Sequence, residues 1–294
     1  MSTGNKETPV TEALSLLHKA TGLLEAQQAV EAEQAHTQAA AEEDDDGFVF
    51  TSTAPMEGRC DICARGPLPW VQNLRALEVT QAQRTEEWFE ARKQCVTASE
   101  LASVLGENPY CSRIQTLRRK LGLVENSFTS FACQHGNDNE DRAIAMYEKK
   151  TGHTVMSFGL LRSQVEGQCH LAGSPDGITH CGRLVEVKCP VTRQIIPGVV
   201  PKHYRSQIEL LMHVTGIRVA DFIQMGTAQL VFDITACPPT PNYYRLIRAK
   251  VDKFVELLKE AREDDQALAK YQRKRATKPK TEDPDKTFAA GFIL

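Results

Sequence analysis

Residues 174–190 read S-P-D-G-I-T-H-C-G-R-L-V-E-V-K-C-P, a Pro-Gly turn followed by a short strand-like run. The turn carries Asp176, and the run that starts at Leu184 carries Glu186 and Lys188. Because side chains alternate along a strand, Glu186 and Lys188 are expected on one face and the adjacent valines on the other. Asp176 can reach the same spot from a neighbouring strand or turn. Two carboxylates and one ammonium are therefore expected close together.

This combination of side chains is typical of metal-assisted phosphodiester hydrolysis. Two carboxylates at close range attract a hard divalent cation such as Mg2+, and a lysine can position or help to deprotonate an attacking water. An isolated D-x9-E-x-K pattern also occurs on exposed strand faces, where Glu and Lys form ordinary cross-strand ion pairs. The flanking residues and three further segments are needed to decide between the two interpretations.

Bulk composition indicates an intracellular protein with a real core. The chain has 294 residues, of which 41% are hydrophobic, and no uninterrupted apolar stretch of membrane-spanning length. Its first residues, M-S-T-G-N-K-E-T, lack the apolar core of a signal peptide. The nine cysteines are odd in number and scattered, which favours free thiols in a reducing compartment over a disulfide framework.

The charge is distributed unevenly along the chain. The net charge is −3, yet residues 1–58 hold 2 Lys or Arg against 11 Asp or Glu, so the remaining residues carry 33 against 27. The part that bears the motif is therefore mildly basic, as expected for a protein that contacts nucleic acid.

Three regions are predicted. Residues 1–69 read as an acidic, low-complexity leader that is largely disordered, residues 70–268 as the folded body, and residues 269–294 as a basic, disordered tail. The pair Cys60 and Cys63 forms a lone C-x-x-C without a second pair at zinc spacing, so we expect a loop that enters the body. The basic cluster at 272–280 is compatible with a nuclear-localisation signal, a DNA contact or a solvated end.

The body alternates between helical and strand patterns. Caps and apolar periodicity predict helices that start at Thr85, Thr97 and Ser112 and others over 137–151, 202–215 and 242–268. Strands are predicted over 153–161, 168–173, 183–188, 219–225 and 229–235. This order predicts an α/β fold in which helices flank a small mixed sheet.

Four segments together resemble the lambda-exonuclease-like, or YqaJ viral recombinase, family of PD-(D/E)xK nucleases. They read W-x3-R-x4-T-A-S from Trp88, G-x3-E from Gly136, S-P-D-G followed by E-x-K-C-P, and Y-x2-Q-I from Tyr204. The resemblance covers residues 84–226 and implies the restriction-endonuclease-like core of that family.

The resemblance also implies a role for each matched position. Asp176 and Glu186 would be metal ligands, with the Val187 carbonyl as a further oxygen ligand. Lys188 would position and activate the water. Glu140 would complete the acidic cluster, although at its position it could also be an ordinary exposed helix residue.

Three more positions are implied to act on the substrate or to support the site. Arg92 and Ser99 would hold a phosphate, and Gln207 would support the site from the following helix. A guanidinium fork suits phosphate oxygens, and Ser99 lies in the first turn of a capped helix, where free N–H groups favour an anion. Ser99 could instead be only a capping residue, and Gln207 could merely satisfy a buried backbone group.

The function that the resemblance implies is a Mg2+-dependent DNA nuclease in which Mn2+ can substitute. The leading interpretation is a 5′-to-3′ exonuclease on duplex DNA with a free end, acting in recombination or repair. A single-strand annealing recombinase is its implied partner, a trimer its implied assembly, and no membrane is expected. A structure-specific endonuclease of the same fold is the first alternative. A non-catalytic DNA-binding relative is the second, and it would be expected to have lost Asp176, Glu186 or Lys188.

Overall fold

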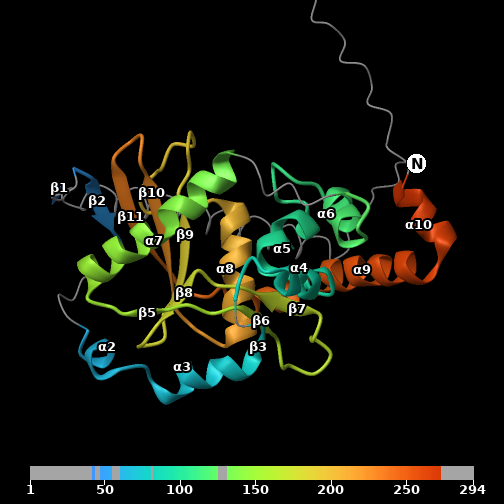
Figure 1. Ribbon diagram of the computed structural model, residues 1–294, viewed down its shortest axis with the longest axis horizontal. Coiled ribbons are helices and arrows are strands. Elements are labelled where there is room, and N and C mark those ends of the chain that lie inside the picture. Colours follow the sequence, from blue (N-terminus) through green and yellow to red (C-terminus); the bar gives the residue numbers. More distant parts are fainter. Residues whose placement is uncertain (1–41, 44–46, 55–59, 81, 125–130, 273–294) are drawn as a thin grey trace, which may run out of the picture.

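The centre of the computed structural model, which describes residues 42–43, 47–54, 60–80, 82–124 and 131–272, is a seven-stranded mixed sheet (Figure 1). In spatial order its strands are β1 (Glu42–Glu43), β2 (Val49–Ser52), β11 (Val231–Cys237), β10 (Ala220–Gly226), β9 (Leu184–Lys188), β8 (Gly177–Thr179) and β5 (Val155–Met156). Strand β9 pairs in parallel with β10 and antiparallel with β8. The motif strand is thus an interior strand of the sheet.

Strand β9 is buried on both faces, and its residues alternate as predicted. Val185 and Val187 pack in one hydrophobic core together with Ile223 and Phe232, whereas Leu184 packs in a second core on the opposite face. This alternation leaves Glu186 on the face of Leu184, inside the protein.

Helices cover both faces of the sheet, which confirms the predicted α/β class (Figure 1). Helix α7 (Phe131–Thr151) covers one face and buries Ala143, Met146 and Tyr147 against the valines of β9. The other face is covered by α8 (Lys202–Thr215), α5 (Ala98–Leu105) and α9 (Tyr243–Glu263).

A buried polar network fastens α7 to the sheet. The Tyr147 hydroxyl donates to Asp221 Oδ2 on β10 at 2.6 Å, and Arg183, just before β9, donates to both Asp221 oxygens at 2.6 Å. Burial and the Asp221 charge raise the pKa of Tyr147, so its hydroxyl stays a donor. The network fixes the position of α7 and of every side chain on it.

The helix starts predicted at Thr85, Thr97 and Ser112 are confirmed, whereas the helix predicted over 137–151 begins earlier, at Phe131. Thr85 Oγ1 accepts the Trp88 N–H at the start of α4 (Glu86–Lys93), Thr97 and Glu100 form the capping box of α5, and Ser112 caps α6 (Arg113–Lys120). Gly106 ends α5 in the left-handed conformation at φ 80°.

A second, four-stranded sheet corrects one prediction. Its strands are β3 (Glu78–Thr80), β6 (Leu160–Arg162), β7 (Leu171–Gly173) and β4 (Val96–Thr97). The single strand predicted over 153–161 is wrong, because β5 lies in the large sheet and β6 in this one. Between the two strands, Phe158 is buried at 2% exposure and the Gly159 N–H donates to the Glu78 side chain at 2.8 Å, which interrupts the ladder.

The folded body begins earlier than residue 70. Strand β2 pairs in parallel with β11, Phe48 and Phe50 are 1% and 8% exposed, and the Phe50 ring stacks on Phe232 at 6.0 Å between centroids. The Cys60–Cys63 segment, expected as a loop, leads into the short helix α2 (Asp61–Arg65), which is followed by α3 (Pro69–Asn73) and the 3-10 turn η1 (Leu74–Leu77). Because residues 1–58 are acidic overall, their composition did not indicate that Phe48 and Phe50 are buried in the core.

At the other end, the single helix predicted over 242–268 is divided into α9 and α10 (Asp265–Gln272). Residues 1–41 and 273–294, and with them most of the predicted leader and of the basic cluster at 272–280, lie outside the described residues. None of the described helices combines the length and apolar character that crossing a bilayer requires.

If β2 belongs to the core, Phe50→Ala should lower the free energy of unfolding by about 3–5 kcal/mol, the usual cost of removing a buried phenyl ring. Leu246→Ala, at a position on α9 that is 73% exposed, is the control and should change stability by less than about 0.5 kcal/mol. Urea unfolding followed by circular dichroism measures both. Equal stability of the two variants would mean that residues 47–54 do not contribute to the core.

Candidate active site

Asp176 lies in the turn between β7 and β8, and β9 holds its side chain in place. Its Oδ2 accepts the Val187 N–H at 2.7 Å. The next residue must be glycine for steric reasons, because a Cβ at Gly177 would lie 2.2 Å from Val155 Cγ1 on β5. The S-P-D-G turn is therefore packed tightly between two strands, and Asp176 points toward β9.

The predicted ligand atoms lie around the ammonium group of Lys188. Its ammonium donates to Glu186 Oε1 and, at 2.8 Å, to the Val187 carbonyl, and it lies 3.8 Å from Asp176 Oδ2. Three acceptor oxygens, two from β9 and one from the turn before β8, thus surround the ammonium. The contact between Glu186 and Lys188 agrees with the strand alternation predicted from sequence.

Helix α8 supplies two further groups to this site. Gln207 Nε2 donates to Glu186 Oε1, which places the predicted supporting residue in direct contact with the carboxylate. The Tyr204 ring centroid lies 5.5 Å from Lys188 Nζ and offers its π-face to the ammonium. Tyr204 was quoted in the sequence motif without a role, and its spacing of three residues from Gln207 puts both on one helix face.

Glu140 joins the site from α7. Its Oε2 accepts from Arg84 Nη2 at 2.8 Å, an ion pair that the sequence did not suggest. Burial, together with the charge of Asp176, raises the pKa of the Glu140 carboxyl. Glu140 therefore lies close enough to Asp176 for the two negative charges to interact.

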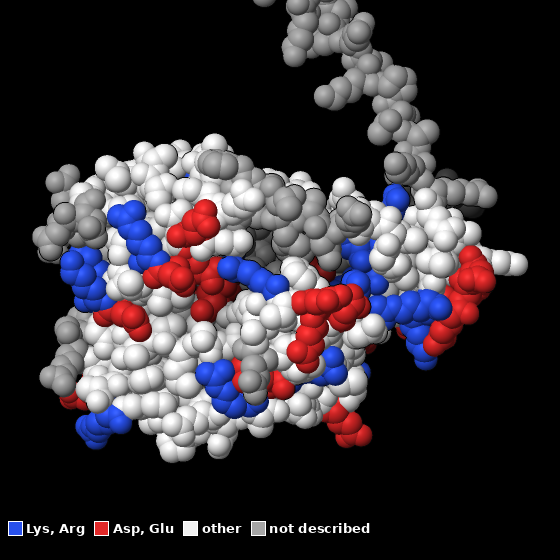
Figure 2. Space-filling view, in the orientation of Figure 1, with Lys and Arg blue, Asp and Glu red and all other residues white. Residues whose placement is uncertain are grey.

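Burial and neighbouring charges shift the pKa values of Glu186 and Lys188. Burial and the Asp176 charge raise the pKa of Glu186 to about 8. Burial alone would lower the pKa of Lys188, but Glu186 and Asp176 outweigh it, and the net shift is upward. Lys188 is accordingly a firmly protonated cation within an acidic cluster. Figure 2 shows acidic side chains gathered where α7 crosses the sheet, with Lys and Arg on both sides.

The donor set fits a hard divalent cation. Glu186 is fully buried, and its Oε2 has no hydrogen-bond partner among the described residues. A buried carboxylate oxygen without a partner is costly unless a cation or water satisfies it. Oxygen-only ligands from carboxylates and one backbone carbonyl are the set that Mg2+ and Mn2+ prefer.

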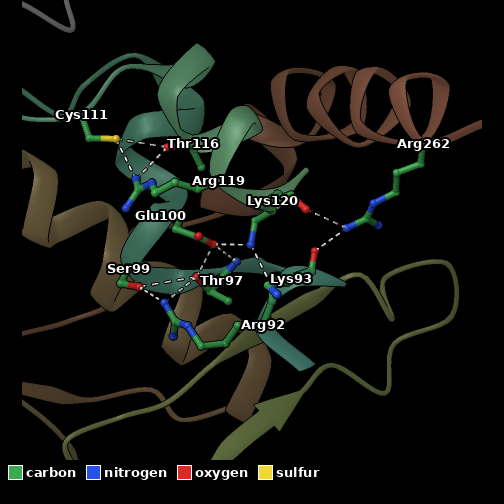
Figure 3. Close-up of polar contacts among 10 residues, drawn as sticks. All are labelled: Arg92, Lys93, Thr97, Ser99, Glu100, Cys111, Thr116, Arg119, Lys120 and Arg262. Carbon is green, nitrogen blue, oxygen red and sulfur yellow. Dashed lines mark hydrogen bonds and ion pairs between the residues drawn. The ribbon is translucent and has the colours of Figure 1, made fainter. Parts of the chain in front are cut away.

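A second cluster of polar side chains contains Arg92 and Ser99. It lies beside the S-P-D-G turn that carries Asp176. Figure 3 shows the two side chains pointing toward one another, with Arg92 Nη2 donating to Ser99 Oγ at 2.8 Å and to Thr97 Oγ1 at 3.2 Å. The Arg92 guanidinium also stacks on the Trp88 ring at 4.2 Å. Burial lowers the pKa of Arg92, but a guanidinium remains charged in proteins.

These two residues line a pocket of about 220 Å³ together with Arg119 and Lys120 of α6. Lys120 is ion-paired with Glu100 at 2.6 Å, whereas Arg92 and Arg119 have no carboxylate partner in the described part of the chain. Burial alone would raise the pKa of Glu100, but the charges of Lys120 and Arg92 outweigh it and lower that pKa. The single negative charge of Glu100 offsets only one of the positive charges in the pocket. The pocket keeps a surplus of positive charge suited to an anion.

Sequence reasoning missed Arg119 and Lys120. The signal was the run Arg118-Arg119-Lys120 at the end of α6, but a basic C-terminal turn is common because it complements the helix dipole. Only the packing of α6 beside α5 shows that two of the three side chains face the pocket.

Trp88 connects the pocket to the acidic cluster. One side of its indole carries Arg92, and its Nε1 donates to Ser174 Oγ at 2.9 Å, in the S-P-D-G turn. Gln83 braces the same turn by donating to the Pro175 carbonyl at 3.0 Å. The anion pocket and the turn that carries Asp176 are thereby held at a defined separation.

Residues 87–218 match the YqaJ-like viral recombinase domain. This part of the chain is similar to that domain. A protein of Acanthamoeba polyphaga mimivirus is 32% identical over 163 residues, which is 48% of this chain and 29% of that protein. A protein of African swine fever virus (isolate Tick/Malawi/Lil 20-1/1983) is 28% identical over 180 residues, 52% of this chain and 50% of that protein. The chain spans half or less of the length of these viral relatives.

Two solved structures share the fold. The alkaline exonuclease LHK-Exo from Laribacter hongkongensis has a TM-score of 0.53 with 26% identity, covering 64% of this chain and 100% of that one. The same exonuclease in complex with dAMP has a TM-score of 0.54 with the same identity and coverage. Residues 87–218 therefore lie within a fold shared with this exonuclease, the PD-(D/E)xK nuclease fold expected from sequence.

Because Gly177 has no room for a Cβ, Gly177→Ala should lower the free energy of unfolding by about 1–3 kcal/mol, the usual cost of overpacking. Gly136→Ala is the matched control, since a Cβ at this helical glycine meets nothing within 4 Å. It should be neutral or stabilising by up to about 1 kcal/mol. Urea midpoints of both variants test the tight packing of the Asp176 turn, and a stable Gly177→Ala protein would refute it.

Proposed function

We propose that the chain is a divalent-cation-dependent deoxyribonuclease, and specifically a 5′-to-3′ exonuclease that degrades duplex DNA from a free end in recombination or repair. The observation that carries the proposal is the meeting of Asp176, Glu186 and the Val187 carbonyl around Lys188, beside a cationic pocket at Arg92 and Ser99. The family match and the likeness to an alkaline exonuclease support it.

The cation proposed for the acidic cluster is Mg2+, with Mn2+ able to replace it. Asp176, Glu186, Glu140 and the Val187 carbonyl would hold it. When bound, such an ion stabilises negative charge on the phosphate and makes a water molecule more acidic.

The protein's own groups position the reactants. The Lys188 ammonium, which donates to Glu186 and to the Val187 carbonyl, would position and activate an attacking water and balance charge. Gln207 fixes the Glu186 carboxylate through its amide. Burial of Glu186 excludes water from one side of the site, which strengthens each electrostatic contact there.

The cationic pocket is proposed to hold the terminal 5′ phosphate of the DNA. Arg92 offers a planar fork, Ser99 a hydroxyl and free N–H groups of the first turn of α5, and Arg119 a second cation. Trp88 would keep this phosphate at a fixed distance from the acidic cluster, as cleavage next to a chain end requires. The solved complex of LHK-Exo with dAMP, a deoxynucleoside monophosphate, supports nucleotide binding by this chain.

The partner and the assembly are carried over from the family resemblance. We propose a single-strand annealing recombinase as the partner and a trimer as the assembly. Light scattering on the purified protein tests the assembly, and cross-linking in the presence of such a recombinase tests the partner.

Lys188→Ala should lower the rate of DNA hydrolysis by about two to four orders of magnitude, the scale expected for a group that positions the nucleophile. DNA affinity should change little, because one of many phosphate-facing charges is lost. The assay is degradation of end-labelled linear duplex in Mg2+. A variant with near wild-type rate would make Lys188 a structural residue.

The matched control for this assay is removal of the cation. Wild-type activity should vanish in EDTA and return with Mg2+ or Mn2+, while Ca2+ should permit binding without efficient turnover. Robust hydrolysis in chelator would overturn the proposed function.

Linear duplex with a 5′ phosphate should be degraded much faster than the same duplex with a 5′ hydroxyl. Arg92→Ala should remove most of that difference, since a charge-assisted phosphate contact contributes roughly 1.5–3 kcal/mol, or ~10- to 150-fold. Arg248→Ala, at a largely exposed arginine on α9 outside the pocket, is the control and should keep the preference. Rapid nicking of closed circular DNA, with no preference between the two ends, would favour the endonuclease alternative.

A further inference from the structure

Four side chains of the kinds that can ligate a metal gather at one place outside the acidic cluster. Cys60 precedes α2, Cys63 lies within it, His153 precedes β5, and Cys181 lies in the turn that joins β8 to β9. One ligand atom from each, three sulfurs and one ring nitrogen, lies within 4.8 Å of all the others. Three chain segments separated by up to about 120 residues thus bring soft ligands to one point.

The spacing agrees with a tetrahedral centre. Zinc bonds of ~2.3 Å to sulfur and ~2.0–2.1 Å to nitrogen place the ligand atoms of a tetrahedron about 3.5–3.8 Å apart. His153 Nδ1 lies 3.7 Å from Cys63 Sγ and 3.5 Å from Cys181 Sγ. Both distances match the edges of such a tetrahedron.

We propose that Cys60, Cys63, His153 and Cys181 bind one Zn2+ in a closed Cys3His site. Four protein ligands leave no position open for water or substrate, so the site is structural rather than catalytic. Its sulfur and nitrogen donors also separate it chemically from the oxygen-only cluster at Asp176 and Glu186, which selects hard cations.

The backbone around the four ligands is already braced. The Leu68 N–H donates to the His180 carbonyl at 2.9 Å, and the His180 N–H donates to the Thr154 carbonyl at 2.8 Å. His180 Nδ1 lies 3.2 Å from the Cys63 carbonyl, and the Trp70 ring covers Gly182, where a Cβ would come within 2.1 Å of it. The three segments are therefore held together by contacts that do not involve the ligand atoms.

Cys181 connects the proposed zinc site to the hairpin that carries the acidic cluster. The β8–β9 hairpin carries Asp176 at one end and Glu186 on its returning strand, and Cys181 lies in its turn, five residues from each. At ~3.3 Å per residue the ion would lie about 16 Å along the strands from the carboxylates. It would clamp the turn to α2 and β5, and so fix the hairpin that presents the acidic cluster.

The test is the metal content of the full-length protein, purified without metal-affinity steps and measured by inductively coupled plasma mass spectrometry. Wild-type protein should contain about one zinc per chain, and Cys181→Ser and His153→Ala should lose it. Cys169→Ser, at an exposed cysteine outside the cluster, is the matched control and should keep it. Asp176→Asn should also keep it, which separates this site from the proposed nuclease centre.

A second readout does not depend on the folding of variants. Wild-type protein exchanged into Co2+ should show the visible absorption of tetrahedral cobalt with a thiolate charge-transfer band, and removal of the zinc should lower Tm by about 5 °C or more. Zinc-free wild-type protein that gives no such spectrum would overturn the site. A disulfide between any two of the three cysteines in native protein, found by mass spectrometry, would do the same.

Discussion

The burial of Glu186 in the middle of the sheet is the constraint on which the rest of the structure depends. An unpaired carboxylate in such a place costs several kcal/mol, and the strand that carries it cannot be moved to the surface, because its valines form the core on the other face. Compensation comes from Lys188 two residues on and from Gln207 on α8. The other oxygen, Oε2, has no hydrogen-bond partner among the described residues, and burial together with the Asp176 charge raises the pKa of Glu186 to about 8. The cation proposed for this site would satisfy that oxygen.

The two helices that sandwich the sheet serve the site as well as the cores. Helix α7 is fastened by the contact of Tyr147 with Asp221, which itself is held by Arg183 at the start of β9. This helix also carries Glu140, whose pKa is raised by burial and by the charge of Asp176. Helix α8 places Gln207 and Tyr204 on the opposite side of the same strand. The acidic cluster thus lies where α7 and α8 pack against β9 from opposite faces of the sheet.

Trp88 contacts both the anion pocket and the turn that carries Asp176 of the acidic cluster. A single indole stacks on Arg92 and hydrogen-bonds to Ser174, so a shift of either site would break a contact at the other. A rigid aromatic bridge holds its length better than a flexible side chain would, because few torsions are free. This rigidity suits an enzyme that must measure from a chain end to a scissile bond, as proposed here.

The sequence by itself determined the local features. The alternation that pairs Glu186 with Lys188, the capping box of Thr97 with Glu100 and the helix over residues 202–215 were predictable, because each depends on side chains within a few positions of one another. Motif resemblance added Arg92, Ser99 and Gln207, all of which the structure brings to one of the two clusters.

Tertiary structure alone decided the long-range contacts. Periodicity reports which face of an element is buried but not against what, so the approach of Arg119 to Arg92 and of Arg84 to Glu140 could not be predicted. The same limit hid β2, because Phe48 and Phe50, just before and within the strand, follow an acidic stretch, and it made the C-x-x-C at Cys60 look solitary. Its companions His153 and Cys181 are about 90 and 120 residues away, and only the packing of α2 against the β8–β9 turn brings them together, because ligand geometry is a property of space rather than of spacing along the chain.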